Sequence, residues 1–70
     1  MTIGERLRQC RLNKGFKHQM DLALRCGWKN SARICNYEKD VRVPRPRDAE
    51  ILACVLKTTP SYLIFGVTSE

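Results

Sequence analysis

The twenty residues QMDLALRCGWKNSARICNYE (19–38) decide the fold, and they divide into two short helices at Gly27. The first half carries one apolar helix face at positions i, i+1 and i+4, formed by Leu22, Ala23 and Cys26. Gly27 readily adopts the left-handed conformation that ends a helix, and Trp28 follows it as an apolar plug. The pattern therefore predicts a helix that stops at Gly27 and turns.

The second half predicts another helix with one buried side and one free side. Asn30 is a good N-cap, and Ile34 and Tyr37 give this helix a buried i, i+3 edge. Small, hydrogen-bonding and cationic residues are left at its start and outer side: Ser31, Ala32, Arg33 and Asn36. Two helices arranged in this way predict a helix-turn-helix, whose second helix enters the DNA major groove by its N-terminus.

The length and net charge of the chain limit its domain number, its class of partner and its location. Seventy residues make one small domain (1–70, with an ordered core at about 2–66), and the net charge is +6 with a pI near 9.6. That excess favours a polyanion partner, although an anionic membrane surface is the alternative. No stretch is apolar enough to span a bilayer, and the N-terminus lacks a signal-peptide region. We therefore expect a cytoplasmic protein without a membrane partner.

The four cysteines invite a disulfide or zinc interpretation, which their spacing does not favour. No C-x-x-C pair is present, the gaps are wide, and His18 is the only histidine. Each cysteine falls inside an apolar-periodic segment, so we expect small buried hydrophobic residues and no metal or cofactor. Redox sensing remains an alternative, chiefly for Cys35 in the second helix of the motif.

A capping signal opens the chain. Thr2 followed by Glu5 is a capping box, which predicts a helix from about Ile3 to near Lys14, with Gly15 as its C-cap. Ile3, Leu7 and Cys10 line its buried side. Lys17 and His18 lead into the next helix, and His18 stands in the cap position where serine or threonine would be better, so we expect a weak cap.

The segment KDVRVPRPR after the motif is basic and rich in proline. Asp40 stands where the chain needs a left-handed residue, and Pro44 and Pro46 are expected to keep the segment extended. Its four basic residues form either a solvated loop or a phosphate-binding loop: Lys39, Arg42, Arg45 and Arg47. Next to a helix-turn-helix the second interpretation is favoured, because this loop lies beside the DNA backbone.

Two further helices are expected. The fourth runs from about Arg47 to Leu56, with Asp48 and Glu50 at its N-terminal end and a core stripe of Ile51, Leu52, Val55 and Leu56. Thr59-Pro60 opens a short fifth helix, SYLIF, which Gly66 closes, and the last four residues, VTSE, are expected to fray. The fold class predicted is an all-α, compact five-helix bundle without strands.

The ordered set of signals resembles the Xre/Cro-type helix-turn-helix family, which includes the DNA-binding domains of phage repressors of the lambda-repressor-like fold. The resemblance covers nearly all of residues 3–66, and no single signal is specific by itself. It is carried by GERLRQCR, Gln19-x-x-Leu22-Ala23, Gly27-Trp28, Ile34-Cys-Asn-Tyr-Glu38, Pro44 and Thr59-Pro-Ser-Tyr-Leu-Ile-Phe-Gly66. It implies five helices and a role for individual positions.

The resemblance assigns DNA contacts along the motif. It implies base reading by Asn30, Ser31 and Ala32, with Asn36 one turn later. Asparagine suits adenine, and the Ala32 methyl could pack on a thymine methyl. Arg33 is open between guanine and a phosphate, and Asn30 and Ser31 could instead simply cap the helix. Phosphate contacts are expected from Gln19, Lys29, Lys39, Arg42 and Arg45.

Other positions are expected to be structural. Arg11 and Glu38 match a pair that bridges the first helix to the reading helix in relatives, and Trp28 and Tyr37 are expected in the core rather than as stacking platforms. Three departures from the family pattern stand out: His18 replaces a hydroxyl cap, Asp40 replaces glycine, and the turn has one extra residue at Lys29-Asn30. The extra residue shifts the register of the turn relative to the family. The roles assigned to residues 29–33 are therefore defined only to within one position.

These features and the resemblance predict a sequence-specific regulator of transcription, a phage or prophage-type repressor that binds double-stranded DNA as a homodimer on a two-fold operator. The resemblance also implies that it is associated with the nucleoid of a bacterial or phage-infected cell. It would occlude RNA polymerase or recruit it by contact. Tyr62, Ile64 and Phe65 of the fifth helix either mediate self-association or close the core. An antitoxin that holds a toxin and its own promoter is the alternative, although no toxin-binding extension is evident. An enzyme with a small-molecule substrate is disfavoured, because no nucleophile–base pair or phosphate loop can be assembled.

Overall fold

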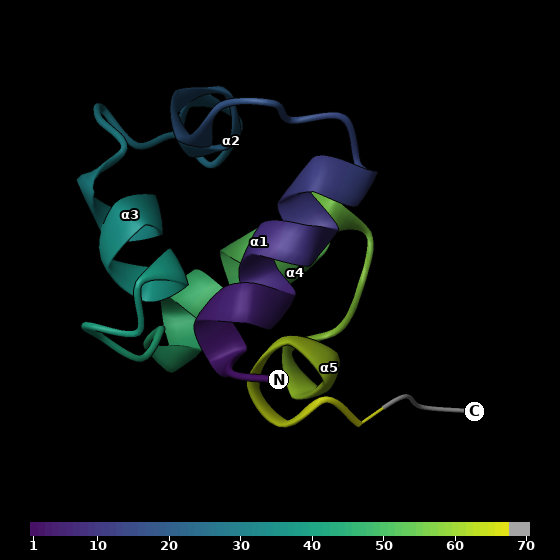
Figure 1. Cartoon of the computed structure of the whole chain (residues 1–70). Helices are drawn as coiled ribbons and strands as arrows, with labels where there is room; N and C mark the ends of the chain where they lie inside the picture. The colour runs from purple at the N-terminus through teal and green to yellow at the C-terminus, as the bar shows by residue number, and fades with distance from the viewer. Residues whose placement is uncertain (68–70) are drawn as a thin grey trace.

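Five helices build the structure, a computed structural model that describes residues 1–67 (Figure 1). They are α1 (Ile3–Asn13), α2 (Gln19–Arg25), α3 (Ala32–Glu38), α4 (Pro46–Leu56) and α5 (Pro60–Phe65). No strand occurs between residues 1 and 67. The predicted all-α, five-helix architecture is therefore confirmed. Residues 68–70, where most of the expected frayed end falls, lie outside the described residues.

The ends of α1 follow the sequence signals. The Thr2 hydroxyl accepts a hydrogen bond from the Glu5 amide at 3.1 Å, and the Glu5 carboxylate accepts one from the Thr2 amide at 2.8 Å. This is the predicted capping box, which satisfies two of the free donors at the helix start. The C-cap is Lys14 rather than the predicted Gly15, which comes one residue later, has φ +87° and turns the chain toward α2.

The turn between α2 and α3 begins at Gly27, as predicted. Gly27 has φ +83°, and the Trp28 amide donates back to the Ala23 carbonyl at 2.9 Å, which closes the end of α2. The start of α3 differs by one residue from the prediction, because the N-cap is Ser31 rather than Asn30. Asn30 still serves the helix, since its side-chain oxygen accepts from the Ala32 amide at 2.9 Å.

Asp40 joins the end of α3 to the start of α1. It has the left-handed conformation that the sequence predicted, with φ +60°. Its carboxylate accepts from the Thr2 hydroxyl at 2.7 Å and from the Gly4 amide at 2.9 Å. Gly4 allows this approach, because a Cβ there would overlap the carbonyl oxygens of Tyr37 and Glu38. These contacts hold the C-terminal end of α3 against the N-terminal end of α1.

Two expectations for α4 were wrong. Pro46 does not extend the loop but is the first helical residue, a position where its missing amide hydrogen costs nothing. The core face is also rotated from the predicted stripe, because Ile51 and Val55 are only half-buried. The buried residues of α4 include two alanines and an aspartate beside the two predicted leucines, and the full set is Asp48, Ala49, Leu52, Ala53 and Leu56.

One core draws on all five helices. Figure 1 shows α1 crossing in front of α4, with α2 above, α3 to the left and α5 below. The core residues are Leu7, Leu22, Ala23, Ile34, Tyr37, Leu52, Ala53, Leu56 and Leu63. Tyr37 is buried, and Trp28 packs against this core half-buried, as predicted. The expectation of buried cysteines was wrong: Cys54 is exposed on α4, and the other three, Cys10, Cys26 and Cys35, are only half-buried.

The fifth helix matches its signals. The Thr59 hydroxyl accepts from the Tyr62 amide at 3.1 Å, Pro60 is the first helical residue, and Gly66 closes the helix with φ +72°. Leu63 is the residue that α5 gives to the core, whereas Phe65 is 75% exposed. Among the helices of residues 1–67, none has the length and apolar character needed to cross a membrane.

The Asp40 contacts predict a pH-dependent stability. Hydrogen bonds from the Thr2 side chain and the Gly4 amide lower the pKa of Asp40 below its usual value. A carboxyl group with a lowered folded-state pKa stabilises the fold above its unfolded pKa of about 4, and that stability is lost as pH falls further. Asp40→Asn keeps a residue that tolerates positive φ. We expect it to be less stable than the wild type at pH 7 and to approach it below about pH 3.

Urea unfolding curves of both proteins at pH 7, 4, 3 and 2 measure this difference. A stability gap of the same size at every pH would show that the carboxylate charge of Asp40 contributes nothing.

Candidate nucleic-acid interface

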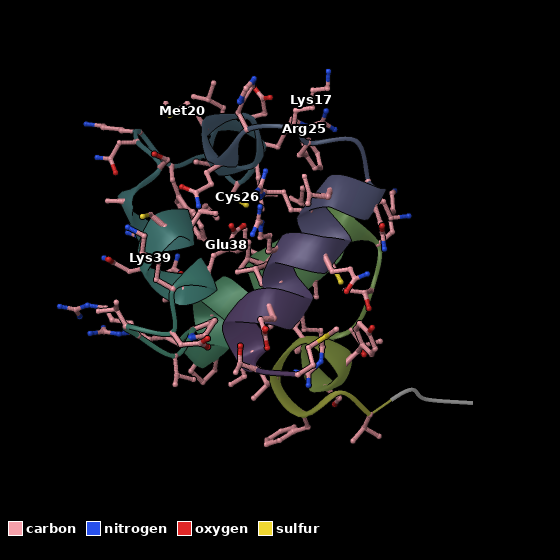
Figure 2. The ribbon with its side chains drawn as sticks, viewed as in Figure 1. Lys17, Met20, Arg25, Cys26, Glu38 and Lys39 are labelled. Carbon is pink, nitrogen blue, oxygen red and sulfur yellow. The ribbon has the colours of Figure 1, made fainter. Side chains whose placement is uncertain are left out.

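A buried ion pair fixes the position of α3. The Arg11 Nε lies 2.7 Å from the Glu38 Oε2, and the two side chains are only 6% and 4% exposed. The Gln19 side-chain amide also donates to Glu38, at 3.0 Å. Figure 2 shows Glu38 between α3 and α1, on the side of α2. One carboxylate therefore joins the first three helices.

Arg11 has further partners within the same cluster. One of its terminal nitrogens donates to the carbonyl oxygens of Phe16 and Lys17, each at 2.8 Å, and the other lies 3.3 Å from Glu38. The chain between α1 and α2 is thus held by the same guanidinium that holds α3. A planar, five-donor group suits this arrangement, which lysine could not reproduce.

The outer side of α3 is open to solvent. Ala32 and Arg33 are exposed, and Ser31 and Asn36 are half-buried, so none of them is enclosed in the core. The Ser31 side chain makes no capping hydrogen bond, which leaves its hydroxyl available. The Asn30 side chain is exposed and caps Ala32, although its amide nitrogen is not used in that contact.

A hollow of about 790 Å³ lies between the outer side of α3 and the loop before α4. Ala32 and Asn36 line it from α3, and three arginines line it from the other side: Arg42, Arg45 and Arg47. We call these three residues the loop arginines, although Arg47 is the second residue of α4. Arg47 belongs to the basic segment KDVRVPRPR, which was expected to lie beside the DNA backbone.

Positive charge is concentrated on this part of the chain. The nineteen residues 29–47 hold six of the thirteen basic residues and two of the seven acidic ones, which gives them a net charge of 6 − 2 = +4. Glu38 is buried against Arg11, and Asp40 is bonded to Thr2 and Gly4, so both carboxylates are engaged internally.

Four of the five residues expected to contact phosphates are exposed: Lys29, Lys39, Arg42 and Arg45. Gln19 differs from them, because its amide is half-buried and bonded to Glu38, with one of its two amide hydrogens used there.

One cluster was missed from the sequence. The guanidinium of Arg33 lies over the Trp28 ring, 4.9 Å from its centroid, and one of its nitrogens lies 3.3 Å from the Asp48 carboxylate. The other Asp48 oxygen accepts a hydrogen bond from the Tyr37 hydroxyl. Burial and this bond to Asp48 raise the pKa of Tyr37, so the hydroxyl stays protonated at neutral pH. Residues 33 and 48 are fifteen positions apart on different helices, and no local pattern connects them.

The cysteine thiols form neither a disulfide nor a metal-binding cluster within residues 1–67. All four cysteines are free, and within residues 1–67 no group of acidic, histidine and cysteine side chains could hold a metal ion. Burial raises the pKa of Cys26 to about 11 and also raises that of Cys10. Both thiols are therefore protonated at neutral pH and are poor nucleophiles.

Comparisons with known proteins agree with this geometry. No family model and no curated protein matches the sequence. The crystal structure of the P22 c2 repressor protein in complex with synthetic operator 9T aligns with a TM-score of 0.85 and 25% identity, over 96% of this chain and 98% of that chain. The solution structure of the DNA-binding domain of the same repressor aligns with a TM-score of 0.80 and 28% identity, over 99% and 88%. The chain therefore has the helix-turn-helix fold of a phage-repressor DNA-binding domain.

The buried ion pair predicts a large and non-additive loss of stability. Arg11→Met leaves the Glu38 carboxylate buried without its cation, and we expect a loss of about 3–5 kcal/mol in the free energy of unfolding. In the double variant Arg11→Met/Glu38→Met the buried charge is gone. Its loss should be several kcal/mol smaller than the sum of the two single losses.

Urea unfolding at pH 7 measures all three variants. Arg8→Met is the control, since Arg8 is exposed on the same helix, and it should change stability by less than about 0.5 kcal/mol. Additive losses in the double variant would contradict the coupling.

Proposed function

We propose that the chain is a sequence-specific regulator of transcription that binds double-stranded DNA, a member of the Xre/Cro-type family acting as a phage-type repressor. The observation that carries the proposal is the open outer side of α3, flanked by the loop arginines, on the fold of a repressor solved with its operator. Such a helix fits the major groove of B-DNA, and flanking cations fit the phosphates beside it.

Base reading is proposed for the N-terminal part and outer side of α3. The residues are Asn30, Ser31, Ala32, Arg33 and Asn36, and they offer hydrogen-bond donors, acceptors and one methyl group. Phosphate contacts are proposed for Gln19, Lys29, Lys39, Arg42 and Arg45. In this arrangement the phosphate contacts set affinity and orientation, and the base contacts set sequence preference.

A homodimer on a two-fold operator is proposed because two copies of a short reading helix double the site that is read. The half-sites would lie about one helical turn, roughly 34 Å, apart. Phe65, the last residue of α5, and Val67 just after the helix are 75% and 57% exposed, and they supply an apolar surface for self-association. A bound dimer would act by excluding RNA polymerase from an overlapping promoter, or by contacting it from an adjacent site.

Selection of bound duplexes from random DNA tests the proposal as a whole. We expect a short enriched site made of two inverted half-sites, each a few base pairs long. A matching duplex should bind at least about a thousandfold more tightly than scrambled DNA at physiological salt. Failure to enrich any sequence would refute sequence-specific binding, and an enriched site without symmetry would refute the dimer.

Two substitutions separate base reading from phosphate binding. Asn36→Ala should reduce affinity for the selected site by about 1–3 kcal/mol and relax preference at one base position. Gln19→Ala should weaken binding to selected and scrambled DNA by the same factor, because phosphates are common to all sequences. Fluorescence anisotropy with both duplexes measures the ratio.

Asn13→Ala is the matched control, since Asn13 is exposed at the far end of α1 and should leave both affinities unchanged. An unchanged ratio of affinities in Asn36→Ala would remove Asn36 from the base-reading set.

A further inference from the structure

Arg33 is the arginine of α3, and two other elements hold its side chain. The indole of Trp28 lies 4.9 Å from the guanidinium carbon on one face, and the Asp48 carboxylate lies 3.3 Å from one terminal nitrogen. Trp28 belongs to the turn after α2, and Asp48 lies in the first turn of α4. The Trp28 ring therefore sets the plane of the guanidinium, and the Asp48 carboxylate sets the direction in which its nitrogens point.

The carboxylate that holds Arg33 is itself held. The Asp48 side chain is only 11% exposed, and its second oxygen accepts from the buried Tyr37 hydroxyl. The Arg33 side chain, in contrast, is 55% exposed and lines the hollow beside Ala32 and Asn36. One of its five N–H donors faces Asp48, which leaves the others available for a ligand.

The charge balance at Arg33 differs from that of its basic neighbours. Arg33 and Asp48 together carry no net charge, which reduces the attraction of this arginine for phosphate. No ion-pair partner lies within 4.0 Å of any of the loop arginines among residues 1–67. A cation that serves only to attract phosphate gains nothing from a carboxylate partner, whereas an arginine that must present a planar fork gains a fixed orientation.

From this geometry we propose that Trp28 and Asp48 are positioning residues that hold Arg33 to read one guanine of the DNA site. Guanine presents two acceptors, N7 and O6, in the major groove, and a fixed guanidinium matches them with two parallel hydrogen bonds. Tyr37 completes the support by holding Asp48. The inference rests on the proposed DNA-binding function. It adds to that function the base that Arg33 reads and the residues that hold Arg33 in place.

The first test uses the free protein. The motion of the Arg33 Nε–H bond, measured by nitrogen relaxation, should be as restricted as that of the α3 backbone. Asp48→Asn should release it to the mobility of Arg42. Equal mobility of Arg33 and Arg42 in the wild type would overturn the positioning role, whatever the protein binds.

The second test uses the duplex obtained by selection and the same duplex with 7-deazaguanine at each guanine in turn. At one guanine per half-site the loss of N7 should weaken wild-type binding about tenfold, and it should have no effect on Arg33→Gln. Asp48→Asn should show a loss of twofold or less at that guanine. Its ratio of affinities for selected and scrambled DNA should fall about tenfold.

Electrostatics alone predicts a different result. Removing the negative charge of Asp48 strengthens attraction to all DNA, so charge alone would raise both affinities and leave their ratio unchanged. The positioning role instead lowers the ratio of affinities for selected and scrambled DNA, while the affinity for scrambled DNA stays the same or rises. Glu50→Gln is the matched control, because Glu50 is exposed on α4 and its loss removes the same charge. An Asp48→Asn variant that behaves like Glu50→Gln, with an unchanged ratio, overturns the inference.

Tyr37→Phe gives a second, milder variant, since it keeps the core aromatic ring and removes only the bond to Asp48. It should reduce the guanine preference in the same direction as Asp48→Asn. A selected site without sensitivity to 7-deazaguanine would overturn the inference and leave the proposed function intact. Selection of no site would overturn both.

Discussion

The buried contact between Arg11 and Glu38 is the constraint on which the rest of the structure depends. Five hydrogen bonds meet at these two side chains, and they join α1, the segment after it, α2 and α3. An isolated pair of buried charges is costly, and full hydrogen bonding is what offsets that cost here. The orientation of α3 follows, because its last residue cannot move without breaking this cluster.

Once α3 is fixed, its two sides have separate tasks. Ile34 and Tyr37 enter the core, and the opposite side faces a hollow lined by cations from another part of the chain. A domain this small has a small core and a narrow margin of stability, so it can spare few apolar side chains from the core for binding. The proposed interface uses residues that the core does not need. The Asp48 cluster is the exception, since it lies where core and interface meet.

Local signals in the sequence predicted most of the backbone. Capping residues and glycines with positive φ act within three or four positions, so helix ends and the left-handed Asp40 could be read directly. Contacts between distant elements could not be read. The rotated face of α4, the exposure of Cys54, and the ion pair of Arg33 with Asp48 all depend on how α4 packs against the other helices. The base-reading and phosphate-binding assignments remain predictions.

The most direct test of the central claim is a map of where DNA touches the protein. Backbone amide signals of the labelled protein are followed by nuclear magnetic resonance as the selected duplex is added. The account predicts that the large changes fall in residues 28–36 and 39–47, with little change along the solvent side of α1. Changes centred on α1 and α5, with α3 unaffected, would contradict it.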